Sequence, residues 1–410
     1  MMKVKILTAV FLFAAQAAFC GISGMPLEVI NHGAGVRALS MGGAVSADSA
    51  DPSASFWSPG MLDSITSNQI EASYEMLYGG SVFNVLGFSG PIGKMGGLGV
   101  SIRNMYYGDY EVVSDEGDEE GTETMNDFML TGAYGRNLFG GLQGGIALKT
   151  IVRGIGGKNY IGFNSDISVT KSFEWGRASL TGKNVIPAGI KYDFSEEKLP
   201  SAVRAGVSLL LLDGVLKVNT DAEKAFAGGP FVICAGAEYK VIEALYLRAG
   251  AGSIGDINEI NAGFGIKYEG FGLDYGAAYT ELSLNHRVAL SYSFGGYELS
   301  LTPEPAVFSP IGGNRRTYIK VNAMTKYDIF KWKVEIKDNK GKIVKSWEGA
   351  GKPDETLIWD GLDRDGMPFN EGDYKAVITV TDENDAVIKS GDVIIKISQG
   401  DQKAIPLFTE

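Results

Sequence analysis

The stretch from residue 260 to residue 294 reads INAGFGIKYEGFGLDYGAAYTELSLNHRVALSYSF, with apolar residues at every second position over three successive runs. In the first run Ile260, Phe264 and Ile266 share one parity, while Asn261 and Lys267 share the other. Successive side chains of a β-strand point to opposite faces. The stretch therefore predicts strands with one apolar face and one face of glycine, charge and hydroxyl. A transmembrane β-barrel with a wet lumen has this pattern.

A soluble antiparallel sheet with one buried face alternates in the same way and is the competing interpretation. Three features favour the membrane barrel. The polar face is rich in glycine, of which the chain has 56 in 410 residues; the chain begins with an export signal; and the last strand ends on an aromatic residue. We therefore expect an all-β fold built on an antiparallel transmembrane barrel of about 14 strands, with 12 as the alternative count.

Residues 1–21 have the features of a secretory signal peptide: two lysines, a short apolar core and then small residues. Cys20 raises the alternative that the mature chain carries a lipid. No later stretch reaches about 18 apolar residues, so a membrane location would require a closed barrel. Cys234 is the one other cysteine, and no disulfide is expected.

Composition also bears on function. The net charge of -12 argues against a nucleic-acid partner, because phosphates require a basic face. The two histidines, His32 and His286, form no recognisable catalytic set, so no enzymatic activity, cofactor or metal is expected. The sequence DGLDRDG at 360–366 fits a calcium loop poorly and is expected to fix a turn. The acidic run at 109–123 is expected to be a solvated outer loop.

The chain divides into six predicted segments. After the signal peptide, residues 22–66 are small, glycine-rich and punctuated by prolines, which predicts irregular backbone packed in the lumen as a hatch or plug. Residues 67–296 are the predicted barrel, and an even strand count places both of its ends in the periplasm. A linker at 297–316 precedes a small Ig-like β-sandwich at 317–398, which is followed by a tail at 399–410.

The segment GVRALSMGGAVSADSADPSASFWSPGML, residues 35–62, resembles the N-terminal hatch of the PorV/PorQ family, which is related to FadL-like outer-membrane proteins of the toluene-transporter type. The family pattern R-x-L-x-M-G-G-A is matched from Arg37 to Ala44, and Ser58 replaces the asparagine of a second pattern, N-P-A-G-L. The resemblance implies a 14-stranded barrel plugged by its own N-terminus. The hatch residues that it singles out are Arg37, Met41, Gly42, Gly43, Asp51, Pro52, Trp57 and Pro59.

Two further resemblances concern the end of the barrel and the tail domain. The stretch HRVALSYSF resembles the terminal strand read by the barrel-assembly machinery, with Tyr292 and Phe294 in the aromatic positions. The C-terminal domain resembles the Ig-like domain of FlgD-type hook-capping proteins, through residues such as Trp347, Trp359 and Gly366.

Charged residues on the inward face of the predicted barrel are the candidate functional residues. They are Glu71, Glu75, Arg103, Arg204, Glu238, Arg248, Asp274 and Arg287. One interpretation is that they pair with one another and with the hatch. The other is that they form a polar path or bind the carboxylate of an amphipathic ligand, to which the planar arginine fork is suited.

The favoured function is passive transport of hydrophobic or amphipathic small molecules across the outer membrane. The alternative is a PorV-like component of type IX secretion that acts as a binding platform for exported proteins, and a third interpretation is an envelope anchor. The expected partners are outer-membrane lipid, the barrel-assembly machinery and either a hydrophobic ligand or a secretion-system or exported protein. The expected location is the outer membrane, with the C-terminal domain in the periplasm.

Overall fold

The computed structural model describes residues 28–113, 119–173, 175–186, 189–197, 201–226, 231–254, 257–383 and 387–398. The expected signal peptide, Cys20 and the tail at 399–410 lie outside these residues. The chain separates into two compact units, one ending at Phe294 and the other beginning at Gly295. Each unit is described by itself.

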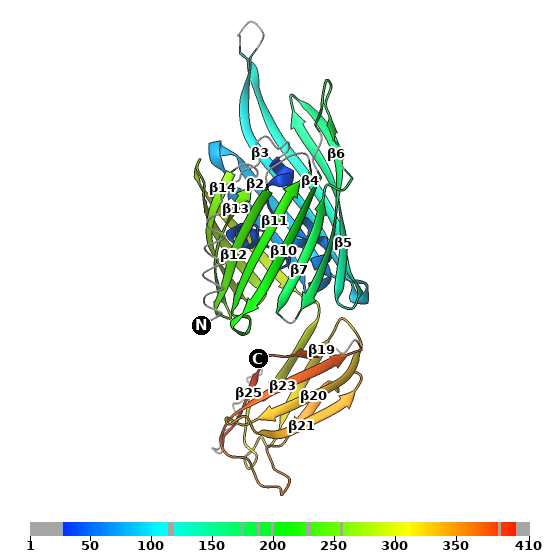
Figure 1. The fold of residues 1–410 in the computed structure, drawn as a ribbon. Helices are drawn as coiled ribbons and strands as arrows, with labels where there is room; N and C mark the ends of the chain where they lie inside the picture. Colours follow the sequence, from blue (N-terminus) through cyan, green and yellow to red (C-terminus); the bar gives the residue numbers. More distant parts are fainter. Residues whose placement is uncertain are drawn as a thin grey trace, which may run out of the picture. The chain divides into compact units, whose positions relative to one another are not determined.

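In the described residues of the first unit, fourteen antiparallel strands close into a barrel, which confirms the predicted antiparallel barrel and the larger strand count (Figure 1). Each strand pairs with its neighbour in sequence, except that β7 pairs with β10. The ring closes where β1 pairs with β16, from Asn68 opposite Phe294 to Met76 opposite His286. The strands are β1 Asn68–Met76, β2 Val82–Pro91, β3 Gly97–Val113, β4 Glu119–Phe139, β5 Leu142–Ile155, β6 Lys158–Phe173, β7 Gly176–Lys183, β10 Ala202–Leu211, β11 Leu216–Ala225, β12 Phe231–Ile242, β13 Leu245–Ile254, β14 Ile257–Tyr268, β15 Phe271–Tyr279 and β16 Leu284–Phe294.

The side chains of the barrel strands alternate between an outward and an inward face, as the sequence predicts. Ile260 and Leu290 face outward and are 67% and 64% exposed, whereas Asn261 and Arg287, at positions of the opposite parity, face inward and are 2% and 1% exposed. The outside of the barrel is therefore apolar and the inside polar, which is the reverse of a soluble sandwich. Within the described residues, no helix has the length and apolarity needed to cross a membrane.

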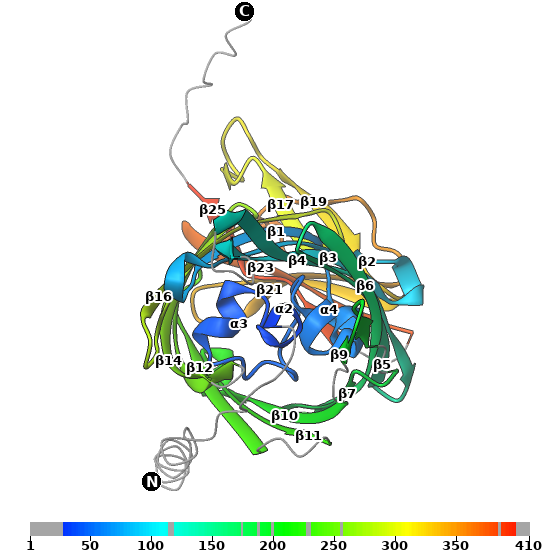
Figure 2. The same ribbon diagram turned by 90° about the horizontal axis from the view of Figure 1, so that it is seen from above.

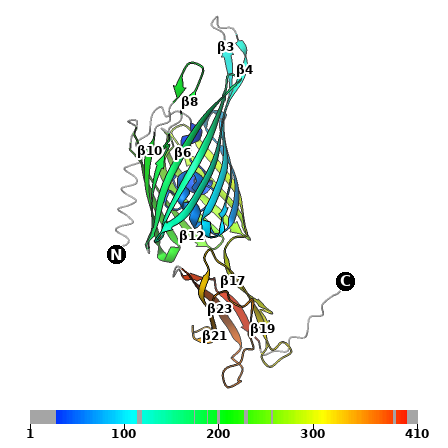
Figure 3. The same cartoon turned by 90° about the vertical axis from the view of Figure 1, so that its right-hand side faces the viewer.

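In the acidic run at 109–123, the described residues 109–113 and 119–123 are strand rather than the expected loop. β3 and β4 have 17 and 21 residues, more than the 9 to 11 that cross a bilayer. They continue as a two-stranded hairpin that projects beyond the other strands (Figures 1 and 3). Cross-strand hydrogen bonds explain this order: Tyr110 donates to Glu123 at 3.0 Å and Thr124 donates to Asp109 at 2.7 Å. These polar pairs replace the apolar contacts of a buried strand.

Residues 28–65, hereafter the inner segment, lie within the ring of strands (Figure 2). They form short helices rather than strands: α2 Glu28–Asn31, α3 Val36–Ser40, α4 Ala54–Trp57 and the 3-10 helix η1 Pro59–Ser64. Short 3-10 helices occur at Tyr78–Gly80 (η2), Gly93–Met95 (η3) and Leu212–Gly214 (η4). A small hairpin, β8 Ile190–Lys191 and β9 Glu196–Glu197, buries Ile190 completely.

The second unit has two sheets around a core centred on Trp359, which is fully buried. One sheet has the order β17-β19-β22 and the other β18-β25-β23-β20-β21, with β24 added to β23. The strands are β17 Glu298–Glu304, β18 Val307–Phe308, β19 Thr317–Met324, β20 Ile329–Lys337, β21 Ile343–Ala350, β22 Thr356–Trp359, β23 Gly372–Asp382, β24 Val387–Lys389 and β25 Val393–Ile397.

The structure corrects the expected linker. Residues 297–316 contribute β17 and β18 to the two sheets of the second unit. The physical reason is that Leu301 and Phe308 are 4% and 3% exposed and pack into the core around Trp359. Pro303 is tolerated because β17 is an edge strand, where a missing ladder donor costs little.

Candidate functional site

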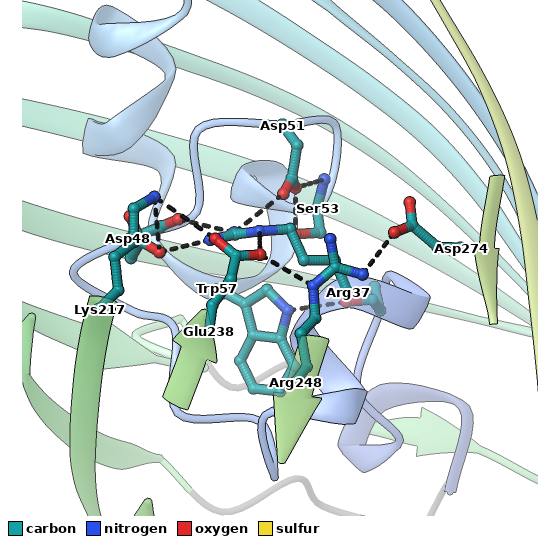
Figure 4. Close-up of polar contacts among 10 residues, drawn as sticks. Arg37, Asp48, Asp51, Ser53, Trp57, Lys217, Glu238, Arg248 and Asp274 are labelled. Carbon is teal, nitrogen blue, oxygen red and sulfur yellow. Dashed lines mark hydrogen bonds and ion pairs between the residues drawn. The ribbon is translucent and has the colours of Figure 1, made fainter. Parts of the chain in front are cut away.

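Arg37 of α3 is the main polar link between the inner segment and the barrel wall (Figure 4). Its guanidinium donates to both carboxylate oxygens of Glu238 on β12, at 2.9 Å and 3.1 Å. It also donates to the carboxylates of Asp48 at 2.5 Å and Asp51 at 3.4 Å. Bidentate, charge-assisted hydrogen bonds of this kind are both strong and directional. Arg37 therefore holds two turns of the inner segment to one wall strand.

The same network continues along the wall. Lys217 of β11 lies 3.2 Å from Asp48, and Arg248 of β13 donates to Glu238 at 2.8 Å and to Asp274 of β15 (Figure 4). It contains three cations, Arg37, Lys217 and Arg248, and four carboxylates, Asp48, Asp51, Glu238 and Asp274. One negative charge is therefore left in excess.

A second ionic cluster joins the two ends of the barrel sequence. Arg287 of β16 pairs with Glu75 of β1 and donates to Glu259 at 2.9 Å and to Asn261 at 2.6 Å. The Nε2 atom of His32, from the inner segment, lies 2.7 Å from Glu75. The pair Glu75 and Arg287 thus fixes both the closing seam of the barrel and the turn after α2.

An aromatic pair from α4 is surrounded by wall cations. Phe56 and Trp57 contact each other edge to face with ring centroids 4.7 Å apart. The Arg103 guanidinium lies 4.2 Å from the centroid of Phe56, and Arg204 lies 4.7 Å from a Trp57 ring. The ammonium groups of Lys149 and Lys183 are each 5.5 Å from Phe56. These distances are within the range of cation–π attraction, so the aromatic pair partly stabilises the buried cations.

The inner segment packs against inward-facing glycines of the wall. A Cβ at Gly236 or Gly250 would overlap the backbone of Met41, and a Cβ at Gly42 would lie 2.5 Å from the Ala251 carbonyl oxygen. Gly42 also has a φ of 66°, which disfavours any other residue. The glycine content of the inward face is therefore explained by close backbone packing rather than by an open pore.

One part of the lumen is apolar. Val29 and Ile30 of α2 pack with inward side chains of the strands and of the β8–β9 hairpin. These partners are Phe83, Val85, Met105, Met129, Ile151 and Ile190, all of them 9% exposed or less. At the edge of this apolar cluster the fully buried Arg103 donates to the His32 carbonyl at 2.9 Å and makes no ion pair within the described residues. A guanidinium thus borders an apolar compartment.

A polar cavity of about 500 Å³ lies at the end of the barrel where β1 begins and β16 ends, called here the terminus-side end. It is bounded on one side by the ionic network described above, which contains Arg37 and Glu238, and on another side by the turn between β14 and β15. Its charged lining residues are Arg37, Asp48, Asp51, Glu71, Arg177, Lys217, Glu238, Lys267, Glu269 and Asp274.

The eight inward charges chosen from the sequence are all 8% exposed or less. Seven of them take part in the contacts above, and Glu71 lines the cavity. Arg204 donates to Asp221 at 2.8 Å and to Glu223 at 3.0 Å. The hatch residues all lie in the inner segment: Gly43 accepts from Arg204, Pro52 packs on Gly87, Trp57 donates to the Ala34 carbonyl at 2.8 Å, and Pro59 faces Gly135 and Gly145.

Sequence reasoning did not single out Asp48, Phe56, Lys149, Lys183 or Lys217. Lys149 and Lys183 could have been found from the alternation of side chains. Each lies an odd number of positions after an outward apolar residue and must therefore face inward. Phe56 had no such signal, since the inner segment has no period. Tyr292 and Phe294 stack at the outer face with centroids 5.7 Å apart, and His286 also faces outward, 2.7 Å from the Tyr275 hydroxyl.

The turn at 360–366 is fixed by hydrogen bonds between a side-chain carboxylate and backbone N–H groups. The Asp363 carboxylate accepts from the backbone N–H groups of Asp365 at 2.9 Å and Met367 at 2.8 Å. Among the described residues, no group of three or more His, Cys, Asp or Glu side chains is placed to hold a metal ion.

No protein-family model matches the chain, and no curated protein matches its sequence. Among solved structures, the Ralstonia pickettii toluene transporter TbuX has 12% identity over 64% of this chain and 99% of its own, with a TM-score of 0.49. The Pseudomonas putida toluene transporter TodX has 12% identity over 66% and 98%, with a TM-score of 0.49. A Pseudomonas aeruginosa FadL homologue has 10% identity over 67% and 99%, with a TM-score of 0.45. At such scores the likeness supports no functional conclusion, and the barrel assignment rests on its own strand pairing.

Proposed function

We propose that this chain is an outer-membrane barrel through which hydrophobic or amphipathic small molecules pass without an energy source. In this proposal the inner segment is a plug, as the resemblance to the PorV/PorQ and FadL-like hatch implies. The observation that carries it is the apolar cluster inside the lumen. The inward face of an aqueous pore is polar, whereas here α2, four wall strands and the β8–β9 hairpin bury apolar side chains together.

The inner segment fills the lumen, so passage requires it to move. Its contacts with the wall are ion pairs, hydrogen bonds, glycine contacts and several separate apolar clusters rather than one continuous apolar core. Polar contacts of this kind can be exchanged for water at lower cost than a packed apolar interface. The buried Arg103 beside the apolar cluster would hold the carboxylate of an amphipathic ligand once the segment has shifted.

A disulfide lock tests this movement. The hydroxyl oxygens of Ser55 in α4 and Ser101 in β3 lie 3.4 Å apart, so Ser55→Cys with Ser101→Cys should form a disulfide in a Cys234→Ser background. The readout is uptake of the apolar fluorophore N-phenyl-1-naphthylamine by intact cells that display the protein. We expect oxidation to abolish the added uptake and a reductant to restore it.

The matched control is a disulfide within the wall. Asn84 on β2 lies directly opposite Asn104 on β3, with the two side-chain amides 3.4 Å apart, so Asn84→Cys with Asn104→Cys ties two wall strands together and leaves the inner segment untied. This variant should take up the fluorophore equally in oxidised and reduced form. If the Ser55–Ser101 lock forms and uptake is unchanged, plug movement is not part of transport.

A second candidate is a PorV-like binding platform for exported proteins in type IX secretion. The long β3–β4 hairpin and the second unit favour it, because neither is needed to close a barrel. In this proposal the second unit is an Ig-like, FlgD-type domain in the periplasm, and Tyr292 and Phe294 are read by the barrel-assembly machinery. Replacing residues 109–123 by a two-residue turn separates the candidates: transport should survive, whereas capture of exported proteins should be lost.

A further inference from the structure

Among the residues that the structure describes, one carboxylate of the polar cavity has no hydrogen-bond or ion-pair partner. Glu71 of β1 is 8% exposed and lines the cavity of about 500 Å³ at the terminus-side end. Within the described part of the chain, its oxygens accept no hydrogen bond and form no ion pair. A buried carboxylate that is left unpaired is strongly destabilising, so natural structures seldom keep one without use. The Glu71 carboxylate is therefore placed to bind a group of a ligand that enters the cavity.

The cations closest to Glu71 in the network are already engaged. Arg37 is shared among Glu238, Asp48 and Asp51, and Arg248 is shared between Glu238 and Asp274. The three-cation, four-carboxylate network already carries one excess negative charge. Glu71 lies beside this excess, which favours a positively charged guest over a negatively charged one.

The remaining cavity cations do not neutralise Glu71 in this arrangement. Lys267 lies in the same cross-strand row, but Gly272 and Ser291 stand between the two residues. Three strand spacings of about 4.8 Å separate their Cα atoms by roughly 14 Å along the wall. The Lys267 ammonium lies 5.5 Å from the centroid of Tyr246, and neither it nor Arg177 makes an ion pair within the described residues. The small side chains of the row leave open space beside Glu71.

We propose that this cavity binds the ammonium group of an amphipathic molecule, with Glu71 as the carboxylate that receives it. Asp51 and Asp274 line the same cavity and add negative potential. An ammonium group donates three hydrogen bonds from one small centre, which suits several carboxylates that do not converge into a metal shell. A metal ion is disfavoured, since the described residues contain no cluster with suitable ligand geometry. This site is separate from the apolar cluster and goes beyond the proposed transport function.

The test uses the purified full-length protein in a non-ionic detergent at mildly alkaline pH, at which hexylammonium is still charged, titrated calorimetrically with hexylammonium. The wild type should bind it saturably and should not bind hexanoate. Glu71→Gln should weaken hexylammonium binding at least tenfold. Glu243→Gln is the matched control, because it removes an exposed carboxylate, in the turn between β12 and β13, that does not line the cavity. It should bind within about twofold of the wild type.

Equal binding by Glu71→Gln and the wild type, or equal binding of hexanoate and hexylammonium, would overturn the proposal. Should Glu71→Gln not fold, the wild type still decides the matter. Carbodiimide labelling of Glu71, mapped by mass spectrometry, should be slowed by hexylammonium and not by hexanoate; unaltered labelling would refute the site. Binding can fail while the disulfide lock still blocks uptake, so the two proposals are tested separately.

Discussion

Replacing Arg37 by alanine should release the inner segment from the wall. The substitution removes the bonds to Glu238, Asp48 and Asp51 and leaves four carboxylates facing two cations. Removing one partner of a buried ion pair destabilises the arrangement by about 3–5 kcal/mol, because the other charge stays buried without its partner. The Arg37 side chain is 13% exposed, so solvent screening favours the lower end, about 3 kcal/mol. Because about 1.4 kcal/mol corresponds to a factor of ten, the ratio of displaced to seated inner segment should rise about a hundredfold.

Two assays measure this displacement. Chymotrypsin should cut the variant at Phe56 or Trp57, which are 2% and 5% exposed in the seated state, and planar-bilayer recordings should show more frequent openings. Arg37→Lys should be intermediate, because it keeps the charge but loses the bidentate fork. Lys158→Ala is the control: its ion pair with Asp193 is 62% and 44% exposed and should contribute little. Protection and conductance like the wild type in Arg37→Ala would refute the role of this network.

Three further predictions follow from single contacts. Gly250→Val should displace the inner segment and raise uptake of the apolar fluorophore, because the new side chain would overlap Met41; Gly132→Val, where nothing lies within 4 Å of the new Cβ, should leave uptake unchanged. Trp359→Ala should lower the stability of the second unit by about 3–5 kcal/mol, measured by denaturant unfolding, while uptake through the barrel persists. Asp363→Ala should cost about 1–3 kcal/mol in the same unfolding measurement, because two backbone donors lose their acceptor; a calcium-dependent shift in the unfolding midpoint of the wild type would contradict this structural role.

The sequence by itself determined which side chains of the barrel face outward and which face inward. That information is local, because a strand alternates its side chains with a period of two whatever its neighbours are. The outward Leu290 and the inward Arg287 follow from it, and so does the closed barrel, since an apolar outer surface leaves no tolerable strand edge. The sequence also predicted the end of the barrel at residue 296, two positions from Phe294, but it assigned residues 297–316 to a linker rather than to the second unit.

Only the tertiary structure decided which inward groups meet. Arg37 and Glu238 are 201 positions apart, and their contact depends on the stagger of the strands and on the path of a segment without periodicity. For the same reason the sequence could not show that Phe56 lies among cations from β3, β5 and β7. It also could not show that Glu71, one of eight similar inward charges, has no partner in the part of the chain that the structure describes. Side-chain direction is a property of one strand, whereas charge pairing is a property of the closed barrel and its contents.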